Sequence, residues 1–167
     1  KTPIIFALDI DDFEKGIQLV KELEFGLGAV KIGPRLLMQH GANAVKKLAE
    51  LVPVFVDNKY YDIPNTMESA VRQTFEAGAT FTTIHSSAGS EALQRMAQLE
   101  IELNRQRPFK ILSVTMLTSF SQQTLPPNLK NQSHINITFY DISQENPSTP
   151  PPPPGQPAAP SAPACPP

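Results

Sequence analysis

Two lysines and two aspartates have a spacing that could support proton-transfer chemistry. Asp57 and Lys59 are two residues apart, so both side chains can face one side of a strand, and Asp62 follows on the next loop. Lys31 lies on the preceding strand-like segment, where it can join them. Alternating charges of this kind hold each neighbour ionised, because an opposite charge favours the charged form of a titratable group. The D-x-K-x-x-D pattern taken alone is weak evidence, and charges on a solvated loop explain it more simply.

These side chains need elements that bring them together, and the sequence contains a repeat of strands and helices. Apolar runs predict buried strands whose starts lie 25, 25, 27 and 30 residues apart: residues 4–8, 29–32, 54–56, 81–84 and 111–114. Apolar residues three and four apart predict helices between them, around residues 13–20, 45–49, 67–75 and 93–101. The alternation indicates an α/β protein with a parallel sheet, either doubly wound or closed as an eight-stranded barrel.

Titratable residues at the strand ends favour the barrel. Asp9, Lys31, Asp57 and His85 each lie at or just beyond the carboxyl end of a predicted strand. Successive strands would then deliver polar groups to one rim, where β/α barrels build their active sites, whereas a doubly wound sheet uses the crevice at its switch point. A complete (β/α)8 TIM barrel takes roughly 200–250 residues. We therefore expect only about the first five β/α units of such a barrel in this chain.

The uneven distribution of proline indicates where the domains of this chain end. Of 18 prolines, 11 fall within residues 147–167. We therefore predict a partial β/α barrel over residues 1–133, an irregular or strand-like transition over 134–146 and a proline-rich disordered tail over 147–167.

A net charge of −2 suggests no nucleic-acid or anionic-membrane partner, and no apolar run approaches the ~20 residues of a membrane helix. No secretory signal is visible, so we expect a cytoplasmic protein. The single cysteine excludes an intrachain disulfide.

Across most of residues 3–133 the chain resembles orotidine 5′-monophosphate decarboxylases. The matching stretches follow the family's order and spacing: residues 6–9 (FALD), 30–33 (VKIG), 55–66 (FVDNKYYDIPNT), 83–86 (TIHS) and 113–119 (SVTMLTS). The D-x-K-x-x-D-I-P-N-T core is highly specific. The resemblance implies a homodimer that decarboxylates orotidine 5′-monophosphate to uridine 5′-monophosphate in de novo pyrimidine synthesis, with neither a metal nor another cofactor.

The resemblance also implies a catalytic role for each residue of the charge network. Lys59 would donate the proton that carbon 6 of the pyrimidine receives, and as a cation it would stabilise the developing carbanion. Asp57 would lie against the substrate carboxylate, where repulsion raises the energy of the bound substrate. Lys31 and Asp62 would complete the catalytic network.

Substrate-binding roles follow from the same resemblance. Lys31 and Asp9 would bind ribose hydroxyls. Asp62 and Thr66 would reach across the dimer interface to the ligand of the neighbouring subunit. Thr118 would lie beside the pyrimidine.

The resemblance also sets expectations about parts that are missing. Complete relatives hold the phosphate with a Gly-Arg pair and close a loop over the pyrimidine, and neither feature is found in this sequence. Losing the binding energy of the remote phosphate should lower turnover as well as affinity. A sheet of five units should also leave the edges of its first and fifth strands unpaired.

Two alternative functions stay open. One is a non-catalytic barrel fragment, or a remnant that binds partners through its sheet edges or its proline-rich tail. The other is a metal-dependent sugar-phosphate decarboxylase or aldolase of the same superfamily. Those enzymes share D-x-K-x-x-D but tend to carry a glutamate where Lys31 stands and lack the I-P-N-T sequence.

Other polar residues have structural explanations. His85 matches a family histidine, yet we expect it to be structural because the chemistry needs no imidazole. Asp11 and Asp12 stand where a helix N-terminus favours acidic side chains, so we expect capping. Asn65 and Glu68 are spaced like a capping box.

Overall fold

The computed structural model describes residues 2–117, 119–121, 124–125 and 139–141. Its strands are β1 (Ile5–Ala7), β2 (Ala29–Ile32), β3 (Val54–Tyr60), β4 (Phe81–His85), β5 (Lys110–Val114) and β6 (Phe139–Asp141). Its helices are α1 (Phe13–Leu23), α2 (Pro34–His40), α3 (Ala42–Ala49), α4 (Pro64–Glu76) and α5 (Ser90–Asn104), with short 3-10 turns η1 (Glu24–Gly26) and η2 (Ser86–Ala88). Within these described ranges, no helix has the length and apolar character needed to span a bilayer.

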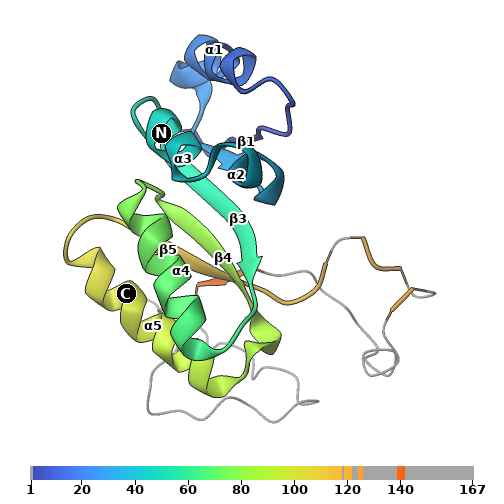
Figure 1. Cartoon of the computed structure of the whole chain (residues 1–167), viewed down its shortest axis with the longest axis vertical. Coiled ribbons are helices and arrows are strands. Elements are labelled where there is room, and N and C mark those ends of the chain that lie inside the picture. The colour runs from blue at the N-terminus through green and yellow to red at the C-terminus, as the bar shows by residue number, and fades with distance from the viewer. Residues whose placement is uncertain (1, 118, 122–123, 126–138, 142–167) are drawn as a thin grey trace, which may run out of the picture.

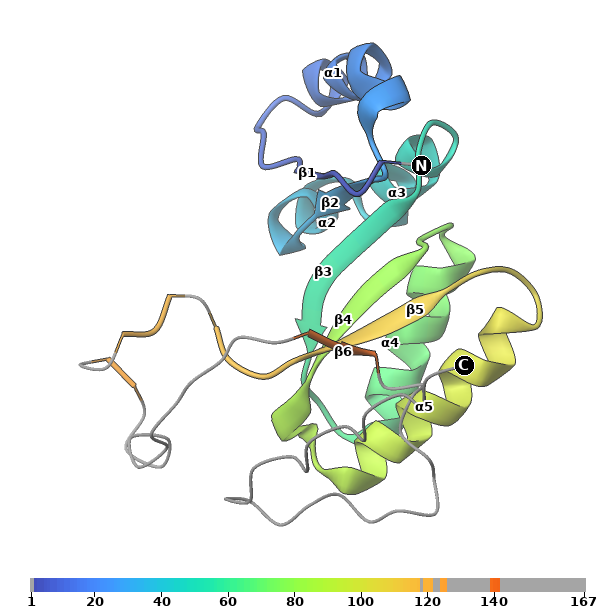
Figure 2. The ribbon, with the colours of Figure 1, turned by 180° about the vertical axis from the view of Figure 1, so that it is seen from behind.

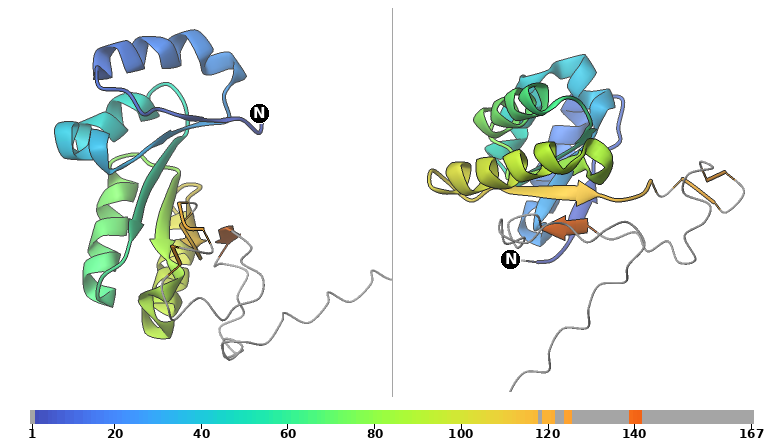
Figure 3. Two further views of the ribbon diagram at one scale, coloured as in Figure 1. Left: turned by 90° about the vertical axis from the view of Figure 1, so that its right-hand side faces the viewer. Right: turned by 90° about the horizontal axis from the view of Figure 1, so that it is seen from below.

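The strands form one sheet in the order β1-β2-β3-β4-β5-β6, and β1 to β5 run parallel (Figures 1 and 2). Each strand pairs with the next one along the chain, without the reversal of order that marks a doubly wound sheet. Helices α4 and α5 pack side by side against strands β3 to β5 (Figure 3). The expected α/β class, with part of a TIM barrel, is therefore confirmed.

The edge of β5 differs from the expectation. Residues 139–141 form β6, which pairs antiparallel with β5 so that Leu112 faces Asp141 and Val114 faces Phe139. The prediction that the fifth strand has an unpaired edge is wrong, because β6 occupies it. The rest of the predicted transition over 134–146, and the whole tail over 147–167, lie outside the described residues. The predicted domain limits therefore stay a prediction.

The core lies between the sheet and its helices and consists of aliphatic and aromatic side chains. The strands contribute Val30, Ile32, Val54, Val56, Ile84 and Ile111, and the helices contribute Val20, Leu36, Leu48, Met67, Val71, Met96 and Leu99. Each fully buried side chain of this size contributes about 1.5–3 kcal/mol relative to an exposed one. Apolar packing therefore sets the positions of the strands.

The start of α4 contradicts the capping box predicted for Asn65 and Glu68. Ile63 is the N-cap and provides no side-chain cap, and Pro64 takes the first helical position, where its missing N–H costs nothing. Asn65 and Glu68 instead interact with α5. At the start of α1 the prediction is confirmed for Asp12, whose carboxylate accepts a hydrogen bond from the backbone N–H three residues later at 3.2 Å.

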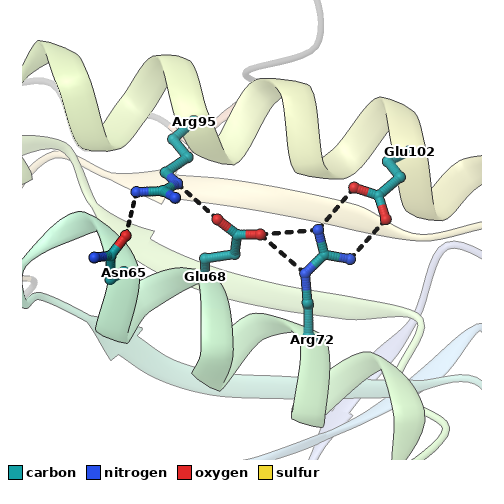
Figure 4. Close-up of polar contacts among 5 residues, drawn as sticks. All are labelled: Asn65, Glu68, Arg72, Arg95 and Glu102. Atoms are coloured by element: carbon teal, nitrogen blue, oxygen red, sulfur yellow. Dashed lines mark hydrogen bonds and ion pairs between the residues drawn. The ribbon is translucent and has the colours of Figure 1, made fainter.

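Glu68 is the centre of an ion-pair network between α4 and α5 (Figure 4). One of its carboxylate oxygens accepts from Arg72 at 2.8 and 3.0 Å, and the other accepts from Arg95 at 2.6 Å. Arg72 also binds both carboxylate oxygens of Glu102 at 2.7 Å, and Arg95 donates to Asn65. These bonds, that from Arg72 first, hold the pKa of the Glu68 carboxyl below its usual value. The network therefore fastens α4 to α5.

Removing the charge of Glu68 should weaken this attachment. We expect Glu68→Gln to lower the free energy of unfolding at pH 7 by about 1 kcal/mol, a value that allows for the partial exposure of the network. The pKa of Glu68 is lowered from 4.5 by folding, so its contribution is complete above pH 4.5 and is lost as the pH falls through the folded-state pKa. As the pH falls below 4.5, the free energy of unfolding should therefore decrease more steeply for the wild type than for Glu68→Gln. Urea denaturation over a pH series measures both effects.

Glu76→Gln is the matched control, because it removes a carboxylate from the exposed C-terminal end of the same helix. A carboxylate at that end interacts unfavourably with the helix dipole, so its loss should leave stability unchanged or slightly higher. Equal losses in the two variants, or parallel pH curves for Glu68→Gln and the wild type, would show that the network adds no stability.

Candidate active site

Side chains from β2 and β3 converge on the carboxylate of Asp57, which is only 15% exposed. Its Oδ2 atom lies 2.9 Å from Lys59 Nζ and 3.7 Å from Lys31 Nζ. Lys31 reaches it because the parallel register sets Lys31 beside Phe55, on the strand next to its own. The structure thus brings together Lys31, Asp57 and Lys59 of the charge network that the sequence predicted.

The strand that carries Asp57 and Lys59 is irregular at the site. β3 continues to Tyr60, and between the pairs Val56–Thr82 and Tyr60–Ile84 it holds three residues against one on β4. The extra residues form a bulge. Within it Lys59 has a φ of 49°, in the left-handed region that residues other than glycine seldom occupy. Such conformations gather at functional sites, where the surrounding contacts must hold them.

Thr83 on β4 belongs to this cluster, although the sequence reasoning assigned it no role. Its hydroxyl accepts a hydrogen bond from the backbone N–H of Lys59 at 2.8 Å and donates to Asp57 Oδ1 at 2.9 Å. The residue is fully buried. The available signal was a pair of threonines inside an apolar strand, since a buried hydroxyl needs hydrogen-bond partners.

Asp62 and Thr66 are not joined to this network. Asp62 is exposed on the turn after β3, and its Oδ1 accepts from the backbone N–H of Ile63 at 2.7 Å. Thr66 is exposed in the first turn of α4. Both residues, together with Lys59, line a recess of about 330 Å³. Their side chains are therefore open to a ligand or to a second subunit.

The remaining predicted residues have different surroundings. Asp9 is exposed just beyond β1 and makes no hydrogen bond or ion pair within the described part of the chain, and Thr118 lies outside that part. His85 ends β4, where its Nδ1 accepts from the backbone N–H of Ser87 at 3.2 Å and its ring lies 5.4 Å from that of Tyr61. Burial lowers the pKa of the His85 imidazole and so favours its neutral form. These contacts fit a structural role for His85.

The cluster offers a cationic amine beside a shielded carboxylate. Lys59 is 36% exposed, so its ammonium group can contact Asp57 and still face open space. A lysine in this position can donate a proton to a strongly basic carbon and stabilise negative charge there, while Asp57 repels any second carboxylate. Over the ranges that the structure describes, no three His, Cys, Asp or Glu side chains are grouped as metal ligands.

Known proteins share this sequence pattern. The chain matches the Orotidine 5'-phosphate decarboxylase / HUMPS family over residues 2–147. The orotidine 5'-phosphate decarboxylase of Parasynechococcus marenigrum is 39% identical over 136 residues, which make up 79% of this chain and 55% of the relative. That of Nitratiruptor sp. is 36% identical over 120 residues, or 70% of this chain and 52% of the relative. The chain thus spans about half the length of the curated relatives it matches.

Solved structures share the fold. An uncharacterized conserved protein from Geobacillus kaustophilus has a TM-score of 0.66 at 27% identity, over 76% of this chain and 60% of that one. The orotidine 5'-monophosphate decarboxylase from Methanocaldococcus jannaschii has a TM-score of 0.67 at 22% identity, over 77% of this chain and 62% of that one. Because the sequence match extends over residues 2–147, the chain belongs to the Orotidine 5'-phosphate decarboxylase / HUMPS family.

Proposed function

We propose that this chain carries the catalytic charge network of an orotidine 5′-monophosphate decarboxylase. Such an enzyme is a carboxy-lyase that forms uridine 5′-monophosphate without a metal or another cofactor. The observation that carries the proposal is the Asp57 carboxylate, held between Lys59 and Lys31 at the carboxyl ends of parallel strands. Family membership and the names of the curated relatives support the choice of substrate.

Lys59 supplies the proton in the proposed reaction. The bond between carbon 6 and the carboxyl group breaks, carbon dioxide leaves, and the electron pair stays on carbon 6. The ammonium group of Lys59 stabilises this charge and then transfers a proton to the carbon, after which water reprotonates the amine. Its exposure of 36%, beside a shielded carboxylate, leaves it free to make that contact.

Asp57 faces the carboxylate that is lost. Its position is fixed by Lys59 and Lys31 at one oxygen and by Thr83 at the other. Two carboxylates at close range repel each other, and the repulsion disappears as carbon dioxide leaves. The interaction is therefore less unfavourable in the transition state than in the bound substrate, which is the condition for a gain in rate.

The ribose and the second subunit account for the other predicted residues. We propose that Lys31 and Asp9 bind ribose hydroxyls and that Thr118 lies beside the pyrimidine. Asp62 and Thr66 would contact the ligand of the neighbouring subunit of a homodimer. Two large apolar side chains beside Asp62, Tyr61 and Ile63, are each 65% exposed, which supports an interface at this rim.

The chain spans about half the length of these relatives, so the proposal concerns the charge network that it contains. A reaction that depends on Lys59 is the expected result.

Lys59→Ala tests the activity. We expect this variant to lose at least about a hundredfold in kcat/KM for orotidine 5′-monophosphate, because general acid catalysis contributes that much or more. The rate at which the absorbance of orotidine 5′-monophosphate falls, under the same conditions, measures the activity of both proteins. Lys47→Ala is the control, since Lys47 lies on α3 and pairs with Glu14 away from the site. Equal rates for wild type and Lys59→Ala, with no binding of uridine 5′-monophosphate, would favour a non-catalytic fragment.

Removal of metal ions distinguishes the proposal from a metal-dependent sugar-phosphate decarboxylase or aldolase. We expect turnover to be unchanged after dialysis against a chelator, because Lys59 supplies the proposed proton transfer and charge stabilisation. The same assay with and without added Mg²⁺ measures this. Loss of activity in chelator that returns with the metal would support the metal-dependent enzyme instead.

Mixed dimers test the proposed contribution of Asp62 from the neighbouring subunit. Lys59→Ala and Asp62→Ala should each be inactive, yet a heterodimer of the two has one site with both lesions and one with none. Co-expression of differently tagged chains should therefore restore about a quarter of the wild-type rate in a statistical mixture. No restoration, in a mixture shown to contain heterodimers, would place both residues in the site of one subunit.

A further inference from the structure

The bulge in β3 leaves the backbone N–H of Lys59 without a place in the regular strand ladder. The ladder between β3 and β4 pairs Val56 with Thr82 and resumes at Tyr60 with Ile84. Thr83 is therefore the single β4 residue opposite the three bulged residues of β3. A buried or half-buried backbone N–H needs a partner, and the side chain of Thr83 provides it at 2.8 Å.

The hydrogen bonds of the Thr83 hydroxyl have a fixed direction. The Lys59 N–H can only donate, so the hydroxyl oxygen accepts there and its own proton is free for Asp57 Oδ1, 2.9 Å away. One hydroxyl thus connects the backbone of the proposed proton donor to the carboxylate that the lysine contacts. Asp57 Oδ2 is left to the two lysines.

We propose that Thr83 is the positioning residue of this site. Its hydroxyl holds Lys59 in the left-handed conformation and sets the orientation of the Asp57 carboxylate, so that ammonium and carboxylate keep a fixed geometry when substrate binds. This inference rests on the proposed decarboxylase function. Thr83 itself touches no reacting atom, and it acts through the two residues that do.

The backbone conformation of Lys59 favours a role for Thr83 beyond simple packing. A lysine in the left-handed region is disfavoured unless its surroundings hold it. The hydrogen bond from its backbone N–H to the Thr83 hydroxyl can hold Lys59 in this conformation. Misplacement of a catalytic group by about 1 Å can reduce turnover on the order of a hundredfold. Loss of the hydroxyl should therefore affect turnover more than the affinity for ligand.

Thr82 offers a matched control on the same strand. It is equally buried, and its hydroxyl donates to the backbone carbonyl of Val56 on β3 at 3.1 Å. Thr82→Val therefore removes a buried inter-strand hydrogen bond of the same kind without touching Lys59 or Asp57. Thr83→Val removes the hydroxyl under study, and Thr83→Ser keeps it.

The test uses two measurements on the full chain. Amide hydrogen exchange, followed by NMR on ¹⁵N-labelled protein, reports directly on the Lys59 N–H. Steady-state kinetics with orotidine 5′-monophosphate separate kcat from KM. We expect Thr83→Val to exchange the Lys59 amide at least about tenfold faster and to lower kcat by about ten- to a hundredfold with KM within about threefold. Thr83→Ser should restore both quantities, and Thr82→Val should change neither.

Two outcomes would contradict the proposed role of Thr83. An unchanged exchange rate at Lys59 in folded Thr83→Val would overturn the proposal, and so would a kcat no lower than that of Thr82→Val. If the wild-type chain shows no turnover, the proposed decarboxylase function is contradicted, but the proposed role of Thr83 is not. The exchange rate of the Lys59 amide then decides whether Thr83 holds that residue in place.

Discussion

The constraint on which the site depends is the need to provide polar partners for one carboxylate that is largely removed from water. Asp57 is 15% exposed, and a buried charge without partners is strongly destabilising. Three strands meet this need: β2 contributes an ammonium group, β3 contributes another, and β4 contributes a hydroxyl. The position of β3 between β2 and β4 thus brings these three groups around one residue.

The same arrangement shows how a rigid scaffold and a distorted segment cooperate. Apolar packing fixes β2, β3 and β4 up to Val56 and Thr82, and the bulge then begins where the polar residues start. Within the bulge the side chain of Thr83 binds the backbone N–H of Lys59, and the ladder resumes at Tyr60. A regular strand would put Asp57 and Lys59 on one face at ordinary spacing. In the bulge Lys59 has a left-handed backbone conformation, and its Nζ atom lies 2.9 Å from Asp57 Oδ2.

The strands and the cluster of charged residues could be predicted from the sequence for physical reasons, whereas features that tertiary contacts decide could not. Lys31, Asp57 and Lys59 were predictable because parallel strands end at one edge and side chains alternate along a strand. Thr83 was not singled out, because a threonine in a strand looks like ordinary core until a bulge removes the ladder. The capping box failed because Pro64 moved the N-cap to Ile63 and left the polar side chains free to bind α5. Pairing of β6 with β5 depends on contacts distant in sequence, which local patterns do not encode.

The strand β6 has a consequence for how the barrel can be extended. A further parallel strand would need the backbone groups of residues 112–114 on β5, and β6 already uses them in antiparallel pairing. The two arrangements are mutually exclusive at that edge. β6 therefore occupies the edge of β5 to which a further parallel strand would bind. A segment that continues the parallel sheet at this edge must therefore displace the three residues of β6.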